Sequence, residues 1–230
     1  VDRLPGWDEG TYWVQDEAAQ VAAELVGASP GQRVLDACAA PGGKSVYLAH
    51  QVGGDGEIVA TDSDPRRLTM VDGATGRLGL AQVRTVARNW VEQPFGALED
   101  DASFDAVLID APCSGLGVIR RHPDIRFARR RGDLARYADR QLALLKALAP
   151  AVRPGGRLVY AVCTFSEAET TGVLERARAE GVLDDYETQS VHLLRPDLPE
   201  GAVWDGALRT LPHRDQSDAF FAVALGRRLR

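Results

Sequence analysis

Residues 33–45 read R-V-L-D-A-C-A-A-P-G-G-K-S, the pattern of a short buried strand, a tight glycine-containing loop and the start of a helix. The helix is expected to continue to about Gln51, and the free N–H groups of its first turn favour anionic ligand atoms. A phosphate-binding loop is excluded because that motif requires glycine where the chain has Cys38. The loop also lacks the Gly-x-Gly-x-x-Gly fingerprint, which argues against a nicotinamide dehydrogenase.

On both sides of this stretch, strand-like and helix-like patterns alternate. Further strands are expected at residues 57–62, 83–87, 104–111, 156–163, 186–191 and 219–225. Helices are expected from Asp16 to Gly27, from Pro65, from an N-cap at Asp133, and from Ser166 in a capping-box spacing with Glu169. This alternation predicts an α/β fold with a doubly wound, Rossmann-like and mostly parallel sheet. The last strand follows a loop instead of a helix, so we expect it to run antiparallel.

The 230 residues contain 45% hydrophobic and 26% charged residues, which is ordinary for a globular domain. No repeat or linker divides them, so we expect one domain, with a helical lead-in at 1–30 and the Rossmann-like core at 31–230. No membrane span or signal peptide is visible, and three cysteines do not make a disulfide framework or a metal site. We therefore expect a cytoplasmic monomer without metal or membrane partner. Because the chain begins with Val1, we expect that it was cut from a longer one.

The net charge of −6 is unevenly distributed along the chain. Eight arginines and three aspartates give residues 120–140 a local charge of +5, so the other residues carry −11. Partners respond to local patches of charge more than to the sum. The acidic total therefore does not exclude a nucleic-acid partner.

The ends of several predicted strands carry polar or reactive residues. They are the loop 38–44, Asp62, the D-A-P-C sequence at 110–113 and the C-T pair at 163–164. In an open parallel sheet the ligand lies beyond the carboxyl ends of the strands, so these residues predict one site. Asp62 follows Gly42 by twenty residues, the distance at which an acidic residue binds ribose hydroxyls. A nucleoside without a pyrophosphate, such as S-adenosylmethionine, fits this pattern; a tight turn followed by a helix-capping aspartate is the alternative.

Cys113 and Cys163 each follow a predicted strand of the parallel sheet. A single cysteine at such a place is usually a small core residue. Here two cysteines follow strands that should be neighbours, and each is followed by Ser or Thr. This arrangement indicates a reactive pair instead. A reactive cysteine must be a thiolate, and Lys44 or the arginines after Cys113 are the cations that could lower its pKa.

Four motifs together resemble the RNA 5-methylcytosine methyltransferases of the Sun/NOL1/NOP2 family, and most closely their bacterial 16S rRNA branch. They are C-A-A-P-G-G-K (38–44), D-A-P-C-S-G (110–115), G-V-I-R-R-H-P-D-I-R (117–126) and V-C-T (162–164). Y-W-V-Q-D-E-A (12–18) and D-A-F-F-A (218–222) also fit this family. The resemblance covers nearly the whole chain.

This resemblance implies methylation of cytosine C5 in RNA, with 16S rRNA as the expected substrate and S-adenosylhomocysteine as the second product. Cys163 would be the nucleophile that adds to cytosine C6, and Cys113 would assist product release. Asp110 would face the cytosine edge and lie close to the cofactor, with Lys44 near the reacting centre. The cofactor would lie along Cys38, Ala39, Ala40, Pro41, Gly42, Gly43 and Lys44, with Asp62 on its ribose.

The sequence departs from the family pattern at two positions. Val162 stands where the family usually has threonine, next to the retained Cys163. Asn89 stands near the position of an aspartate that faces the adenine in the family, so Asn89 is the expected substitute. It can form a hydrogen bond but carries no charge.

The RNA surface is expected to include Arg120, Arg121, His122 and Arg126. Arg129, Arg130 and Arg131 can be part of it or simply a solvated helix face. Members of the bacterial branch carry an upstream RNA-binding region, which we expect to be missing here. Alternatives to an rRNA methyltransferase are one that modifies tRNA, another RNA or a small molecule, and a catalytically silent RNA-binding homologue.

Overall fold

The computed structural model describes residues 1–96 and 103–229. Its strands form a single mixed sheet in the order β3-β2-β1-β4-β5-β9-β8-β7, with β6 also paired to β9. Their bounds are β1 (Arg33–Asp36), β2 (Glu57–Asp62), β3 (Val83–Ala87), β4 (Phe104–Asp110), β5 (Val152–Val162), β6 (Tyr186–Gln189), β7 (Val203–Trp204), β8 (Ala207–Arg209) and β9 (Phe221–Arg227). The sheet therefore includes each strand that the sequence predicted.

The first five strands are parallel, and the C-terminal ones are antiparallel. Leu35 in the central strand β1 pairs with Val59 of β2 and with Val107 of β4. β9 runs antiparallel to β5, β6 and β8, and β7 runs antiparallel to β8. The predicted doubly wound, mostly parallel sheet with an antiparallel C-terminal strand is confirmed.

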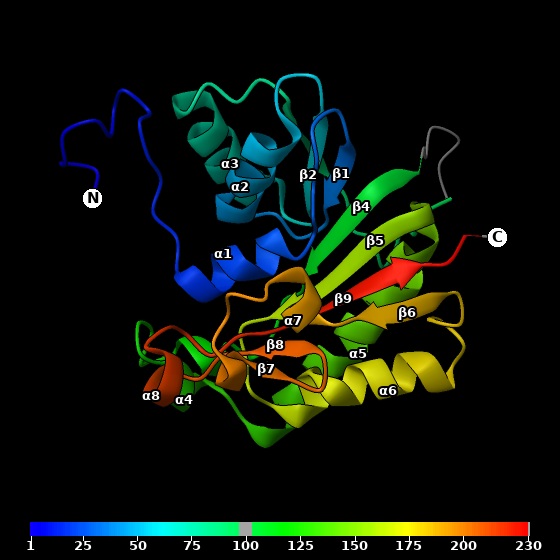
Figure 1. Cartoon of the computed structure of the whole chain (residues 1–230). Helices are drawn as coiled ribbons and strands as arrows, with labels where there is room; N and C mark the ends of the chain where they lie inside the picture. The colour runs from blue at the N-terminus through cyan, green and yellow to red at the C-terminus, as the bar shows by residue number, and fades with distance from the viewer. Residues whose placement is uncertain (97–102, 230) are drawn as a thin grey trace.

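Helices cover both faces of this sheet (Figure 1). Figure 1 shows α1 and α2 on one side, and α5 and α6 on the other. The α-helices are α1 (Glu17–Glu24), α2 (Gly43–Val52), α3 (Pro65–Arg77), α4 (Ile125–Ala128), α5 (Arg131–Leu148), α6 (Thr171–Ala179), α7 (Val191–Leu194) and α8 (Pro212–Asp215). Short 3-10 turns occur at η1 (Leu116–Val118), η2 (Ala149–Ala151), η3 (Glu167–Glu169) and η4 (Glu200–Ala202).

Strand β4 explains why the two faces have separate hydrophobic cores. Val107 and Ile109 pack in the core with residues of α5 and α6, whereas Ala106 and Leu108 pack in the core with residues of α1 and α2. Successive side chains of a strand point to opposite faces, so a continuous apolar run supplies both cores. Full burial of a leucine side chain contributes about 1.5–3 kcal/mol.

Two predicted helix starts are wrong. Helix α5 begins at Arg131, and the carboxylate of Asp133 accepts from the N–H of Arg130 (2.9 Å), so Asp133 lies inside the first turn. Ser166 makes no capping bond with its side chain, and Glu169 is fully buried in η3. Glu169 instead accepts from the N–H of Ser114 (2.8 Å), a tertiary bond that outweighs the local capping preference.

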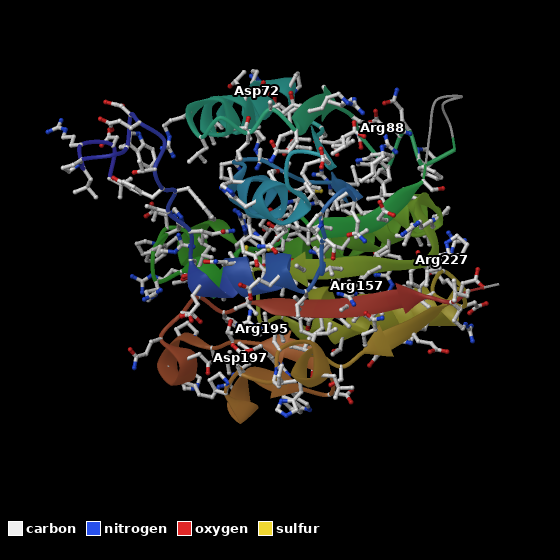
Figure 2. The ribbon with its side chains drawn as sticks, turned by 45° about the horizontal axis from the view of Figure 1, so that its top comes forward. Asp72, Arg88, Arg157, Arg195, Asp197 and Arg227 are labelled. Atoms are coloured by element: carbon white, nitrogen blue, oxygen red, sulfur yellow. The ribbon has the colours of Figure 1, made fainter. Side chains whose placement is uncertain are left out.

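Several element bounds also differ from the prediction; β6 and β9, for example, were expected at 186–191 and 219–225. Helix α1 ends at Glu24, three residues before Gly27. Strand β5 begins at Val152, so the P-G-G sequence at 154–156 lies inside the strand. Arg157 of β5, labelled in Figure 2, donates from Nη1 to the backbone oxygen of Leu25 (3.1 Å) and so joins the end of α1 to the sheet.

The residues before α1 have no regular secondary structure, and α3 holds them in place. Arg77 donates to the backbone oxygens of Trp7 (2.7 Å) and Tyr12 (3.0 Å), and its guanidinium lies 3.7 Å from the centre of the Trp7 ring. This N-terminal segment, residues 1–16, therefore lies beside α3 (Figure 1). Within residues 1–96 and 103–229, no helix is long and apolar enough to cross a membrane.

Candidate active site

The loop 38–44 joins β1 to α2 at the carboxyl end of the sheet. Gly42 has a φ of +110°, and a Cβ atom added there would lie 3.1 Å from the Cα of Val71. Both the backbone conformation and the close approach to α3 therefore require glycine. Helix α2 begins at the next residue, so Lys44 lies in its first turn. The turn thus presents free N–H groups and a cation to the same edge of the sheet.

Lys44 pairs with Asp110, the last residue of β4. Its Nζ lies 2.6 Å from Oδ2 of Asp110 and 5.0 Å from the centre of the Phe220 ring. Burial opposes the positive charge on Lys44, but the carboxylate of Asp110 outweighs this effect, so the pKa of Lys44 is raised. Lys44 therefore remains a cation inside the site.

Asp36 lies beneath this pair and is fully buried at the end of β1. Its Oδ2 accepts from Oγ of Ser45 (2.7 Å), while Oδ1 has no hydrogen-bond partner among the described residues. Burial raises the pKa of Asp36 to about 7, against the effect of the Ser45 hydrogen bond. A carboxyl group that titrates near neutral pH thus lies next to the loop.

The two predicted cysteines meet at the carboxyl ends of β4 and β5. Asp110 pairs with Ala161 across these parallel strands, so the segments that follow them are neighbours. The sulfur atoms of Cys113 and Cys163 lie 3.2 Å apart. A hydrogen bond between the hydroxyls of Ser114 and Thr164 (3.0 Å) joins the same two segments, and both hydroxyl-bearing residues are buried.

The surroundings of the two cysteines shift their pKa values in opposite directions. The hydrogen bond from Cys113 lowers the pKa of Cys163 and outweighs the opposing effect of burial, and the charge of Lys44 acts in the same direction. The same hydrogen bond, together with burial, raises the pKa of Cys113 well above its usual range. The surroundings of Cys163 therefore favour its thiolate, which is the nucleophilic form of cysteine.

Cys163 opens onto a cavity of about 710 Å³. Lys44, Asp110, Arg121 and Phe220 line it together with the loop 38–44, helix α3 and the N-terminal segment. Cys113 does not line this cavity; it packs against the core that includes α5. The Cys163 sulfur and the half-buried ion pair of Lys44 and Asp110 therefore share one accessible space.

A second cavity, of about 150 Å³, lies on the other side of Cys38. Both Asp62 and Asn89 line it, together with Trp90, Pro112 and Arg140. Oδ2 of Asp62 lies 3.1 Å from Nη1 of Arg67, which also donates through Nη2 to the backbone oxygen of Ala40 (3.0 Å). Burial raises the pKa of Cys38, so this third thiol remains protonated.

The predicted RNA-binding arginines have different environments. Arg121 pairs with Asp218, and Arg120 lies 3.5 Å from the same carboxylate and 3.6 Å from that of Asp16. His122 and Arg126 are exposed, and the Arg126 guanidinium lies 4.8 Å from the centre of the exposed Phe127 ring. Of the four predicted residues, Arg121 alone lines the larger cavity. The side chain of Arg131 lies outside the described part of the structure.

Several site residues were not assigned from the sequence. Asp16 lies near Arg120, Asp218 pairs with Arg121, and Phe220 lies beside Lys44. The family resemblance includes the stretches 12–18 and 218–222, but it assigned no role to these three residues. Glu169 and Gln141 lie behind Cys113. A glutamate three residues after a serine reads locally as a capping box, so no sequence signal indicated its buried position. Among residues 1–96 and 103–229, no group of His, Cys, Asp and Glu could hold a metal ion.

Comparison with known proteins gives consistent matches. Residues 23–226 match the family described as 16S rRNA methyltransferase RsmB/F. A probable ribosomal RNA small subunit methyltransferase B from Synechocystis is 36% identical over 98% of this chain and 50% of its own length. The ribosomal RNA small subunit methyltransferase B of Pseudomonas syringae is 46% identical over 79% of this chain and 40% of its own length. The chain thus spans about half the length of the curated relatives that it matches.

Solved structures of similar proteins share the fold. The crystal structure of NSun6 from Pyrococcus horikoshii with SFG superimposes with a TM-score of 0.84 at 26% identity, covering 100% of this chain and 56% of that one. A methyltransferase homologue from the same organism gives a TM-score of 0.79 at 27% identity, covering 99% of this chain and 72% of that one.

Proposed function

The chain belongs to the 16S rRNA methyltransferase RsmB/F family, and from this premise we propose that it methylates C5 of a cytosine in RNA, with 16S rRNA as its substrate. The single observation that carries the proposal is the cysteine pair. The sulfur atoms of Cys163 and Cys113 lie 3.2 Å apart, beside the half-buried ion pair of Lys44 and Asp110. A catalytically silent RNA-binding homologue needs none of these groups, so the pair favours an enzyme.

The residues around the loop fit S-adenosylmethionine, which supplies an electrophilic methyl group when it is bound. The glycine-containing turn at 42–43 leaves room for a ligand, and the helix N-terminus favours its carboxylate. Asp62 and Asn89 line one cavity and offer hydrogen-bond partners for ribose and adenine. Because Asp62 pairs with Arg67 here, cofactor binding requires that this arginine give up at least part of that contact.

Cytosine C5 is a weak nucleophile, and Cys163 overcomes this by covalent catalysis. Its thiolate adds to C6, forming a C6–S bond and moving the electron pair of the C5=C6 double bond toward C5. C5 then takes the methyl group. Loss of the C5 proton and breakage of the C6–S bond restore the double bond and return the thiolate to Cys163. Cys113 assists this release.

Asp110 and Lys44 orient the base and stabilise charge. A carboxylate at Asp110 accepts from the N4 amino group of cytosine or shares a proton with N3, and Lys44 holds it in place at 2.6 Å. The lysine cation also favours the thiolate form of Cys163. The target base reaches these groups only from a single strand or after flipping out of a helix.

The basic segment 120–140 lies along the chain directly after the Cys113 loop, and we assign it to the RNA surface. The exposed Arg126 and Phe127 offer a phosphate contact and a stacking face. RNA affinity should fall steeply with salt, and Arg126→Ala should reduce the slope by about 0.7–0.9, the value for one phosphate contact. An unchanged slope would remove Arg126 from the RNA surface.

The function is tested by incubating the chain with methyl-labelled S-adenosylmethionine and total RNA from a strain that lacks the enzyme. We expect label in 16S rRNA, at C5 of one cytosine, as mapped by bisulfite sequencing. Label in tRNA alone would support the alternative substrate class. No label in any RNA, with a folded protein that binds the cofactor, would contradict the proposed activity for this chain.

A further inference from the structure

Behind the cysteine pair lies a buried polar network that the reaction described above does not use. It is centred on Glu169, whose side chain is fully buried. Oε2 of Glu169 accepts from the backbone N–H of Ser114 (2.8 Å) and from Nε2 of Gln141 (3.1 Å). Oε1 has no hydrogen-bond partner among the described residues. Both donors are N–H groups, which a carboxylate fits because it accepts hydrogen bonds and has no proton to give.

Glu169 and its neighbours hold the residues on both sides of Cys113. Gln141 donates to the backbone oxygen of Pro112 (3.0 Å), and Glu169 accepts from Ser114. The hydroxyl of Tyr160, also fully buried, lies 2.6 Å from the backbone oxygen of Glu169 and 3.1 Å from Oε1 of Gln141. The network therefore fixes the Cys113 loop from β5, α5 and η3.

The charges around the two sulfurs differ in sign. On the cavity side, Cys163 faces Lys44 of α2, with Asp110 of β4 and Arg121 nearby. On the core side, the buried carboxyl group of Glu169 and the hydroxyl of Tyr160 lie in the network that holds the Cys113 loop. Arg129 also approaches this loop, donating to the backbone oxygen of Ser114 (2.8 Å), but it is partly exposed, so solvent screens its charge.

We propose that Glu169 is a positioning residue whose buried negative charge keeps the shared proton of the pair on Cys113, so that Cys163 is the thiolate. An anion close to a thiol disfavours its ionisation, and the effect is larger in a buried site than in water. The pKa of Cys113 is raised by the bond to Cys163, by burial and by the charge of Cys163, and Glu169 adds to these in the same direction. Lys44 and Glu169 thus polarise the pair from opposite sides.

The importance of this polarisation rests on the proposed function, in which Cys163 attacks and Cys113 assists release. Proton placement itself can be measured without RNA or cofactor. Limiting iodoacetamide labels thiolates in proportion to their population, and peptide mass spectrometry separates Cys38, Cys113 and Cys163. A pH series then gives a labelling midpoint for each cysteine, which accessibility alone does not move.

The informative variant is Glu169→Gln, which preserves the size of the side chain and removes its charge. We expect the labelling midpoint of Cys113 to fall by about one pH unit, so that the ratio of Cys163 to Cys113 labelling at pH 7 falls about tenfold. Glu167→Gln removes an exposed charge two residues away and should leave both midpoints unchanged. Unchanged midpoints in folded Glu169→Gln protein would overturn the proposal.

Tyr160→Phe separates charge from structure, because it removes a hydroxyl from the same network and keeps Glu169. We expect little change in the midpoints; a shift equal to that of Glu169→Gln would mean that the network acts only by holding the loop. If Glu169→Gln does not fold, Cys163→Ser provides the test with Glu169 in place. The Cys113 midpoint should stay above the usual cysteine value of about 8.5 in this variant, and a midpoint at or below that value would contradict the proposal. Failure of RNA methylation leaves these results unaffected.

Discussion

The segments after β4 and β5 begin alike and end in different environments. Each leaves a buried parallel strand and carries a cysteine followed by a small hydroxyl residue. Cys163 opens onto the cavity that contains Lys44, whereas Cys113 packs against the core in front of Glu169. The pKa of the thiol is lowered in one segment and raised in the other, chiefly by the hydrogen bond between the two sulfurs and by burial. Lys44 of α2 lies on one side of the pair, and Glu169 of η3 lies on the other.

Replacing each cysteine in turn is the strongest test of the difference between Cys163 and Cys113. Cys163→Ala should lower methyl transfer on the order of 10⁴-fold or more, because the covalent nucleophile is lost. Cys113→Ala should instead accumulate an RNA–protein adduct, since C6–S bond formation remains possible and release is slowed. Denaturing electrophoresis with labelled RNA detects the adduct. Methylation at C5 by Cys163→Ala protein would show that the nucleophile is assigned to the wrong residue.

Removing the cation from the cavity side should have the next largest effect. Lys44→Met leaves the Asp110 carboxylate facing Cys163, which disfavours the thiolate and raises its pKa. We expect activity at pH 7 to fall about 10²-fold and the pH–rate profile to move to higher pH. The matched control is Lys146→Met, which removes the only other lysine, an exposed residue paired with Glu180 on the outer surface. If activity falls but the pH–rate profile does not shift, Lys44 does not act by lowering the pKa of Cys163.

Asp36 tests whether a buried carboxylate in the site lowers the stability of the folded protein. Its pKa is about 7 in the folded state and near 3.8 when exposed, so the folded state binds more protons between these values. Stability should therefore fall by up to about 4 kcal/mol as pH rises from 4 to 7, and change little above that. Asp36→Asn should remove this slope in urea unfolding measured across pH. An identical slope in both proteins would assign it to other groups.

The smallest effect concerns the hydroxyl bridge that couples the two segments. A double-mutant cycle of Ser114→Ala and Thr164→Val should give a coupling of about 0.5–1.5 kcal/mol in unfolding free energy. Pairing Ser114→Ala with Thr69→Val, an exposed position on α3, should give no coupling. Additive effects of Ser114 and Thr164 would mean that the segments are held together by their strands alone.

Much of the fold could be predicted because its strands are continuous apolar runs whose burial is the dominant favourable contribution. The predicted strands all occur, and the loop, Asp62, Asp110 and the cysteine pair meet at one edge. The errors at Asp133 and Ser166 have different causes: Asp133 caps the helix from its third position, which is still a local bond, whereas a tertiary hydrogen bond from Ser114 draws Glu169 away from Ser166. Arg120 and Arg121 show the same limit, since a run of basic residues does not reveal that Asp218 pairs with them.

The sequence by itself determined the order of the strands along the chain, the glycine-containing turn, and the presence of two cysteines at strand ends. Hydrophobic periodicity and backbone requirements act over a few residues, so they can be read from neighbours in the chain. The tertiary structure alone decided which sulfur opens onto the cavity beside Lys44 and which packs against the core in front of Glu169. Lys44 and Glu169 lie 125 positions apart in the sequence, so neighbours in the chain do not reveal that they lie on either side of the cysteine pair.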